Sequence, residues 1–197
     1  ELDRRHRLVR AQSIQRTAGQ LVSRYRFRHI LFQRYLYGSL DEVERVHLHE
    51  QVGTALEELY AAHTESVTAA EITAVAPQLA RHFQEAQNVE KAIHYLHLAG
   101  DRAVQLSAFR EARTHLATAL GLLLTLPDSP ERAQKELALQ LSLGMAWMGT
   151  DPREVEKAYN RARELCLQTG LTSDLYRILG QLSTMHYVGA KHHSARD

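Results

Sequence analysis

The sequence predicts a predominantly α-helical protein, a solenoid of helical hairpins that is preceded by a short segment with a β-hairpin. Beyond residue 40, apolar residues recur every three or four positions, as they do along the buried face of a helix. The breaks between these runs carry residues that begin or end helices. Before residue 40 the pattern differs, because Leu21, Tyr25 and Phe27 fall on alternate positions, which is typical of a strand.

Residues 1–40 form the first predicted domain. The segment that contains Val9 suits a short helix, and residues 13–19 and 21–28 are predicted as two strands. From Ile30 onward the apolar spacing again becomes helical. A helix, a two-stranded wing and a second helix make up the C-terminal part of a winged-helix domain.

Residues 41–197 form the second predicted domain, an α-solenoid whose last repeat is truncated. Pro130 and Pro152 stand at first-turn positions, and Gly170 closes a helix. Three pairs have capping-box spacing: Ser39 with Glu42, Thr68 with Glu71, and Asp151 with Glu154. The expected helices are 41–62, 69–86, 89–106, 108–126, 130–148, 152–168 and 173–189.

Several of these helices share a pattern of small and large residues. The pattern places Leu79, Ala80 and Phe83 before Ala92, Leu96 and Ala99, and Leu143, Gly144 and Trp147 before Ala158, Ala162 and Leu165. Small residues let two helices approach closely, and the large ones fill the adjoining gaps. This packing resembles the tetratricopeptide repeat (TPR). An irregular helical bundle stays open as an alternative.

A TPR-like solenoid implies a concave surface that holds a protein or peptide partner. Judged by their position around each predicted helix, the candidate partner contacts are Arg81, Gln84, Gln140 and Tyr187. A truncated last repeat would leave an apolar face uncovered, so self-association stays open as well.

The composition fits one domain of good size or two small ones. Of the 197 residues 44% are apolar, which is enough for a sizeable core. Lys and Arg number 24 against 23 Asp and Glu, and the net charge of +1 gives no overall case for nucleic acid or an anionic membrane as partner. The single cysteine, Cys166, lies in an apolar helical run and is interpreted as core filling. Without a cleavable signal or a long uncharged span, we expect a cytoplasmic protein that does not enter a membrane.

One stretch carries a more specific resemblance. The segment YRFRHILFQRYLYGSL, with RVHLHEQVGTALEELY shortly after it, is similar to the junction between winged-helix and TPR-like regions in STAND-class signalling ATPases. That class has AAA-like or NB-ARC-like ATPase modules and includes bacterial regulators with cyclase, kinase or DNA-binding outputs. The resemblances together cover nearly the whole chain.

The resemblance implies a nucleotide-sensing role for one histidine. His29 takes the histidine place of a Met-His-Asp motif that reaches the ADP phosphate and holds the closed, inactive form, with Arg28 in the Met place and Ile30 in the Asp place. An imidazole at a helix start can donate to a phosphate there. Alternatively, His29 caps the helix or packs against the wing. The resemblance also implies an upstream ATPase domain as partner in the parent chain, with ATP or ADP bound mainly by that domain.

No catalytic or metal-binding pattern stands out. There is no G-x-x-x-x-G-K-[ST] loop, so we expect neither enzymatic activity nor a cofactor of the chain's own. The histidine groups considered as ligands are His94 and His97 with His82 on the neighbouring helix, and the pairs His47 with His49 and His192 with His193. C-x-x-C and H-E-x-x-H are missing, and no metal site is expected.

We therefore interpret the chain as a non-catalytic regulatory and interaction fragment of a larger STAND-type signalling ATPase. Partner binding on the solenoid would bias the nucleotide-dependent switch. The alternative is a DNA-binding winged-helix module of a transcriptional regulator with a helical effector domain, in which Arg24, Arg26 and Arg28 neutralise phosphates. Against it, residues 1–40 are too short to include a recognition helix.

Overall fold

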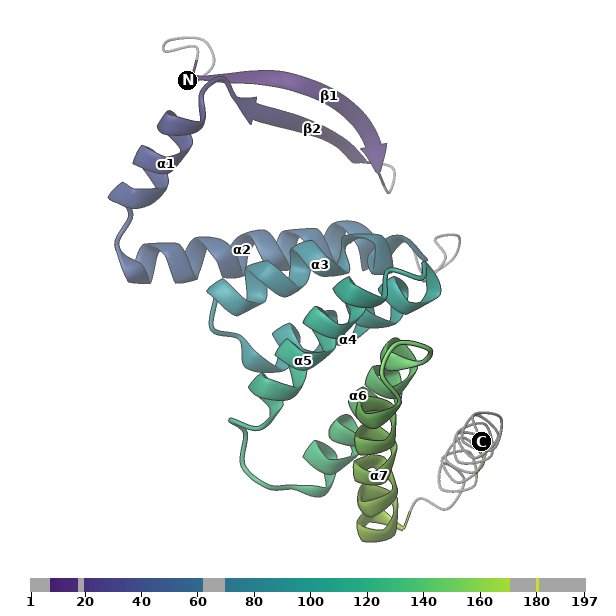
Figure 1. Cartoon of the computed structure of the whole chain (residues 1–197). Helices are drawn as coiled ribbons and strands as arrows, with labels where there is room; N and C mark the ends of the chain where they lie inside the picture. Colours follow the sequence, from purple (N-terminus) through teal and green to yellow (C-terminus); the bar gives the residue numbers. More distant parts are fainter. Residues whose placement is uncertain (1–7, 18–19, 62–69, 171–179, 181–197) are drawn as a thin grey trace. The chain divides into compact units, whose positions relative to one another are not determined.

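The protein is predominantly α-helical with one small antiparallel hairpin, as predicted (Figure 1). The computed structural model describes residues 8–17, 20–61, 70–170 and 180. Within them lie β1 (Val9–Thr17), β2 (Gln20–Phe27), α1 (Ile30–Ser39), α2 (Glu42–Ala61), α3 (Ala70–Glu85), α4 (Val89–Gln105), α5 (Phe109–Leu123), α6 (Pro130–Trp147) and α7 (Pro152–Thr169). The helix predicted at 173–189 lies outside the described residues, apart from Gly180.

The chain divides into two compact units. Unit 1 is Glu1–Asn88 and contains β1, β2 and α1 to α3, whereas unit 2 is Val89–Asp197 and contains α4 to α7. The domain boundary predicted between residues 40 and 41 falls at the connection from α1 to α2 and stays a prediction.

The hairpin is longer than its sequence pattern indicates. Val9 pairs with Phe27 and Thr17 with Gln20, with one irregularity between Ala11 and Ser13. The short helix predicted around Val9 is therefore wrong. A helix of so few residues has little stability on its own, because helix nucleation is costly. A strand at this place instead forms hydrogen bonds with the N–H and C=O groups of β2.

Two caps fix the turn between α1 and α2. The hydroxyl of Ser39 donates to the carbonyl of Leu36 at 2.8 Å, so this residue belongs to the last turn of α1. Asp41 Oδ1 accepts from the N–H of Glu44 at 2.7 Å, and Glu44 Oε2 accepts from the N–H of Asp41 at 3.0 Å. This is a capping box, so the box predicted for Ser39 and Glu42 is displaced by two residues.

The later caps follow the sequence more closely. Ser129 Oγ accepts from the N–H of Arg132 at 3.1 Å, and Asp151 caps α7, although it bonds the N–H of Arg153 rather than that of Glu154. Gly170 ends α7 at a φ of 73° and donates to the carbonyl of Cys166, which confirms it as the C-cap. The remaining predicted box begins at Thr68, outside the described residues.

The same turn ends both α3 and α4. Gln87 and Ser107 have φ values of 56° and 58°. The next residue in each turn donates its N–H to a carbonyl five residues back, Asn88 to Phe83 and Ala108 to Ala103. This is the bonding of a Schellman motif with a residue other than glycine at the left-handed position, which costs about 1 kcal/mol each.

Each helix pair brings a glycine of its first helix against a large side chain of its second. The contacts are Gly53 with Phe83 between α2 and α3, Gly100 with Leu116 between α4 and α5, and Gly144 with Tyr159 between α6 and α7. A Cβ added at these glycines would lie 2.9, 2.6 and 2.9 Å from the facing side chain, closer than packed atoms allow. The absence of a side chain on one helix therefore makes room for the largest core residues of the other.

The core residues lie along these contacts. In unit 1, Leu79 and Phe83 are fully buried. In unit 2, a cluster of buried side chains joins α6 to α7, with Trp147 packed against it: Leu137, Val155, Tyr159, Ala162, Leu165 and Cys166. Cys166 is thus buried core, as predicted.

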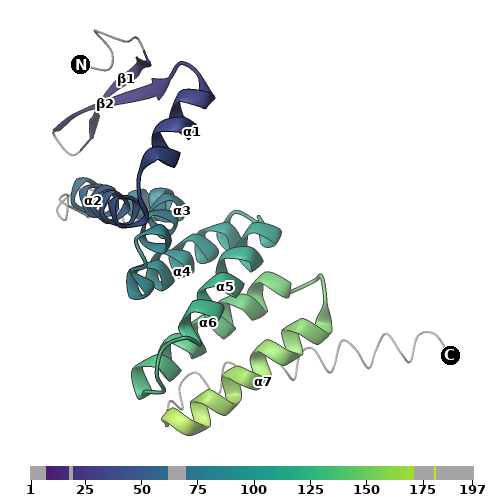
Figure 2. The same cartoon turned by 90° about the vertical axis from the view of Figure 1, so that its left-hand side faces the viewer.

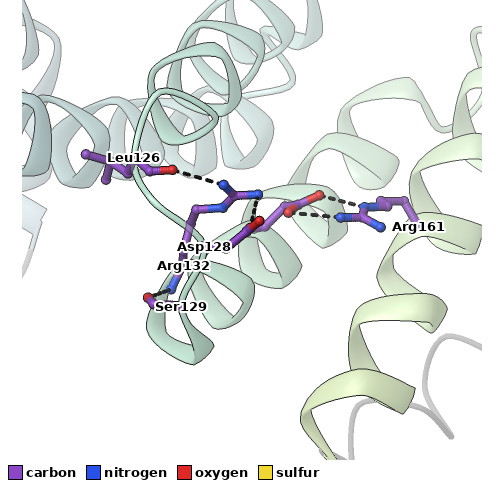
Figure 3. Close-up of polar contacts among 6 residues, drawn as sticks. Leu126, Asp128, Ser129, Arg132 and Arg161 are labelled. Carbon is purple, nitrogen blue, oxygen red and sulfur yellow. Dashed lines mark hydrogen bonds and ion pairs between the residues drawn. The ribbon is translucent and has the colours of Figure 1, made fainter.

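One buried carboxylate is neutralised between α6 and α7. Glu136 is 4% exposed and accepts from Arg161, with Nε to Oε1 at 2.7 Å and Nη2 to Oε2 at 3.2 Å (Figure 3). The hydrogen bond that Arg161 donates to Glu136 raises the pKa of Arg161. Nearby, the guanidinium of Arg132 donates to the carbonyl of Leu126 at 2.9 Å and pairs with Asp128 at 2.8 Å (Figure 3). The first pair fixes α7 against α6, and the second fixes the start of α6 to the connection before it.

Replacing Gly144 by alanine should destabilise unit 2. The added Cβ meets the ring of Tyr159, and such overpacking costs about 1–3 kcal/mol. Gly121→Ala is the matched control, because this glycine lies in α5 with nothing within 4 Å of its Cβ. We expect that control to gain about 0.5–1 kcal/mol from helix propensity. Urea unfolding followed by the fluorescence of Trp147, the only tryptophan, measures both. Equal effects of the two substitutions would contradict the packing described.

Candidate functional site

α1 follows the β-hairpin and precedes α2 (Figure 2). Most of its apolar side chains are exposed. It has no buried residue and contacts β2 at its start. Five large side chains are between 40% and 76% exposed, and we call them the α1 surface: Ile30, Leu31, Phe32, Tyr35 and Tyr37. Several exposed large apolar side chains on one short helix are typical of interaction sites.

His29 begins α1. Its Nδ1 accepts from the N–H of Leu31 at 3.3 Å, and its ring meets the ring of Phe32 edge-on with centroids 6.2 Å apart. The histidine thus caps the helix, which was one of the two roles expected for it. Because Nδ1 is the acceptor, the neutral ring carries its proton on Nε2. The helix start therefore offers an imidazole donor, while the N–H groups of Leu31 and Phe32 already bond to Nδ1 and the carbonyl of His29.

Arginines gather beside this junction. Arg10 and Arg26 are directly opposite each other in the hairpin register, an arrangement that is unfavourable for like charges. With Arg28 they line a cavity of about 620 Å³ that also includes Phe27 and Gln33. Among the residues that the structure describes, no carboxylate forms an ion pair with these three arginines.

A second cavity, of about 740 Å³, lies between α1, α2 and α3 within unit 1. We call it the basic cavity. Its cationic or ionisable lining residues are Arg34, Arg45, His49, Arg81 and His82. Its apolar lining residues are Phe27, Ile30, Leu40, Leu48 and Val52, and Gln33 and Tyr37 complete the described lining. No described lining residue is acidic.

A chain of hydrogen bonds crosses this cavity from helix to helix. Tyr37 Oη in α1 lies 3.0 Å from His49 Nε2 in α2, and His49 Nδ1 lies 3.0 Å from His82 Nδ1 in α3. The ring of His49 meets that of Tyr37 at 90°, and the guanidinium of Arg45 lies 5.8 Å from the centre of the same tyrosine ring. This chain is the polar link between α1 and the pair of helices that follows.

The two facing imidazoles cannot both be charged while they stay bonded. One Nδ1 must donate and the other accept, whereas a protonated histidine has a proton on each ring nitrogen. Burial lowers the pKa of His82, and the charges of His49 and Arg81 lower it further, while Glu85 opposes the shift. The bonded form of the pair is therefore favoured at neutral pH.

The residues predicted from sequence fall at several places. Arg81 lines the basic cavity and Gln84 is exposed one turn later on α3. Gln140 is half-buried on α6 in unit 2, and Tyr187 lies outside the described residues. His29 and Arg28 are neighbours at the hairpin junction, and both are exposed. These positions leave their roles in partner binding and nucleotide sensing as predictions.

The pairing of His49 with His82 was missed. The sequence interpretation grouped His82 with His94 and His97, which belong to the other unit. A signal existed, because His49 stands four residues before Gly53 and His82 three residues after Leu79, on the packing faces of their helices. Histidines at core positions of two successive helices are candidates for mutual contact.

Within the described residues, no three His, Cys, Asp or Glu side chains gather as metal ligands would. None of the described helices has the length and apolar content needed to span a membrane. No protein-family model, no curated protein and no solved structure matches the chain.

Acid should weaken the packing of α3 on α2. The folded pKa of His82 lies below its ordinary value of 6.5, so the unfolded chain binds more protons as the pH falls through that region, and stability falls with it. Hydrogen exchange of the α3 amides, corrected for intrinsic rates, should show lower protection at about pH 5.5 than at about pH 7.5.

The variant His82→Phe should lose most of this pH dependence. His47→Gln is the matched control on α2, because the described partner of that exposed ring is Gln51. An unchanged pH dependence in the phenylalanine variant would rule out His82 as its origin.

Proposed function

We propose that this chain is a non-catalytic interaction and regulatory part of a larger STAND-type signalling ATPase. The observation that carries the proposal is the α1 surface. The helix buries none of its own residues, and the exposed side chains are two aliphatic groups, one phenyl group and two tyrosines. A helix gains most of its stability from packing an apolar face, so a helix with this composition is expected to be covered by a partner. We assign that role to the upstream ATPase domain of the parent chain.

In this proposal His29 senses the nucleotide. The imidazole has its proton on Nε2 at the start of α1, and Arg28 lines the cavity beside it. These groups suit the terminal phosphate of ADP bound by the ATPase domain. Docking of that domain on the α1 surface would hold the closed, inactive form.

The signal would pass through the Tyr37, His49 and His82 chain. This chain ties α1 to α2 and α3, so a shift of α1 strains or breaks two hydrogen bonds at the first helix pair. A protein or peptide partner bound to the helix pairs would shift the same equilibrium between the closed and open forms of the parent protein, acting through α2 and α3 rather than through the nucleotide. Arg81, Gln84 and Gln140 remain the proposed contacts for that partner.

A repeated helix pair supports the proposed solenoid. The contact between a glycine and a large residue recurs in all three pairs, and the intervals from Gly53 to Gly100 to Gly144 are similar. Both intervals exceed the 34 residues of a TPR, so they favour a helix-pair repeat in general over TPR spacing. A cytoplasmic location fits this role and forms part of the proposal.

One observation favours DNA binding as a second candidate function. Arg10, Arg26 and Arg28 crowd together at the hairpin without a carboxylate partner among the described residues. Phosphates would relieve their repulsion. An affinity for duplex DNA that falls steeply with salt, and that Arg26→Gln reduces, distinguishes this function from domain docking.

In the parent protein, changes on the α1 surface should release ADP. Leu31→Asp with Tyr35→Asp places charges where the ATPase domain docks, so we expect the ADP affinity to fall by about tenfold or more while the ATP affinity is kept. His29→Ala should act in the same direction by removing a phosphate donor. Calorimetric titration with each nucleotide measures both effects.

The matched control is Leu167→Asp, since Leu167 is 67% exposed on α7 in the other unit. It should leave both nucleotide affinities unchanged. If the α1 variants and His29→Ala also leave the ADP affinity unchanged, the proposed docking and sensing roles are both wrong.

A further inference from the structure

The arginines that line the basic cavity carry positive charge that no described carboxylate neutralises in an ion pair. Arg34, Arg45 and Arg81 line it, and within the described part of the chain none of the three forms an ion pair with a carboxylate. Glu85 influences His82 but does not line the cavity. Three guanidinium groups around one cavity repel each other, and an anion between them removes that cost.

The same cavity has an apolar side. Phe27, Ile30, Leu40, Leu48 and Val52 line it together with the arginines. The volume of about 740 Å³ lies in the range of small-molecule sites, which are mostly apolar with a few polar groups that orient the ligand. A ligand that satisfies both sides has an apolar body and an anionic head.

The polar groups at the inner wall also favour a small ligand over a protein surface. His49 is only 8% exposed and yet lines the cavity, so a group that reaches it must enter between the helices. Tyr37 and His82 are bonded to it there. A slim head group reaches this position, whereas a broad protein surface contacts only the rim.

We propose that the basic cavity binds a small amphipathic organic anion, with a phosphate or carboxylate head held by Arg45 and Arg81 and an apolar body against Leu48 and Val52. Guanidinium groups match both heads through paired N–H donors. The site lies wholly within unit 1, so binding requires neither the parent protein nor the domain docking proposed above.

Binding should also depend on pH. The charged and titratable groups that face His82 are Arg34 and Tyr37 from α1, Arg45 and His49 from α2, and Arg81 and Glu85 from α3. A bound anion offsets the positive charges among them and favours a protonated imidazole. The affinity for octanoate, whose carboxylate stays largely ionised over this range, should therefore rise as the pH falls from about 7.5 to about 5.5.

Calorimetric titration of the 197-residue chain tests the site with four probes: octyl phosphate, octanoate, octanol and inorganic phosphate. We expect octyl phosphate to bind at one site, at least about tenfold more tightly than octanol or inorganic phosphate. Equal binding of octanoate widens the ligand class to carboxylates, and weaker binding restricts it to phosphate esters.

Arg45→Gln with Arg81→Gln should weaken octyl phosphate binding by at least about tenfold. The matched control is Arg110→Gln with Arg163→Gln, two exposed arginines of unit 2. Leu48→Trp narrows the apolar side without changing charge, and should weaken octyl phosphate binding while the helical circular dichroism is kept.

Several results would overturn the proposal. They are no binding of octyl phosphate, equal binding of octanol, or undiminished binding by the variant that lacks Arg45 and Arg81. Tighter binding of an acidic amphipathic peptide than of octyl phosphate would instead assign the cavity to a protein partner.

Discussion

Close approach of two helices at a glycine is the constraint on which this fold depends. In each of the three helix pairs among the described residues, the first helix presents Gly53, Gly100 or Gly144 and the second fills the space with a phenylalanine, leucine or tyrosine. The pair then buries its apolar face internally, with further small residues such as Ala112 and Ala162 fully buried alongside. Helix caps at Asp41, Ser129 and Asp151 set where the helices begin, so the same faces meet.

α1 stands outside this arrangement. The helices that follow it are matched in pairs, whereas α1 meets β2 at one end and is joined to α2 by the bond from Tyr37 to His49. Unit 1 therefore contains both a cluster of polar and cationic side chains and an exposed apolar surface. A pair of imidazoles occupies core positions of α2 and α3, arginines surround the space above them, and the α1 surface remains exposed. The same elements motivate both proposals: the exposed apolar side chains of α1 suggest a docking partner, and the arginines of the basic cavity suggest an anionic ligand.

Much of the fold could be predicted because its signals are local. The bounds of α2 to α7 lie within three residues of those expected, since helical periodicity and the residues that end helices both act within a few positions. The errors arose where local signals compete. Val9 joins a strand because β2 supplies partners, and Asp41 replaces Ser39 as the cap of α2 because α1 continues to Ser39. The contact of His49 with His82 spans two helices, so the spacing of each histidine within its own helix makes the contact a candidate without fixing the pairing.

Hydrogen exchange can show whether another domain of the proposed parent protein covers the α1 surface. The amide exchange rates of α1 should be measured in this chain alone and in the parent protein, with α4 as the internal reference because seven of its residues are buried. We expect the amides of α1 to be protected at least about tenfold more strongly in the parent protein and those of α4 to be unchanged. Equal exchange of α1 in both proteins would contradict the proposed docking.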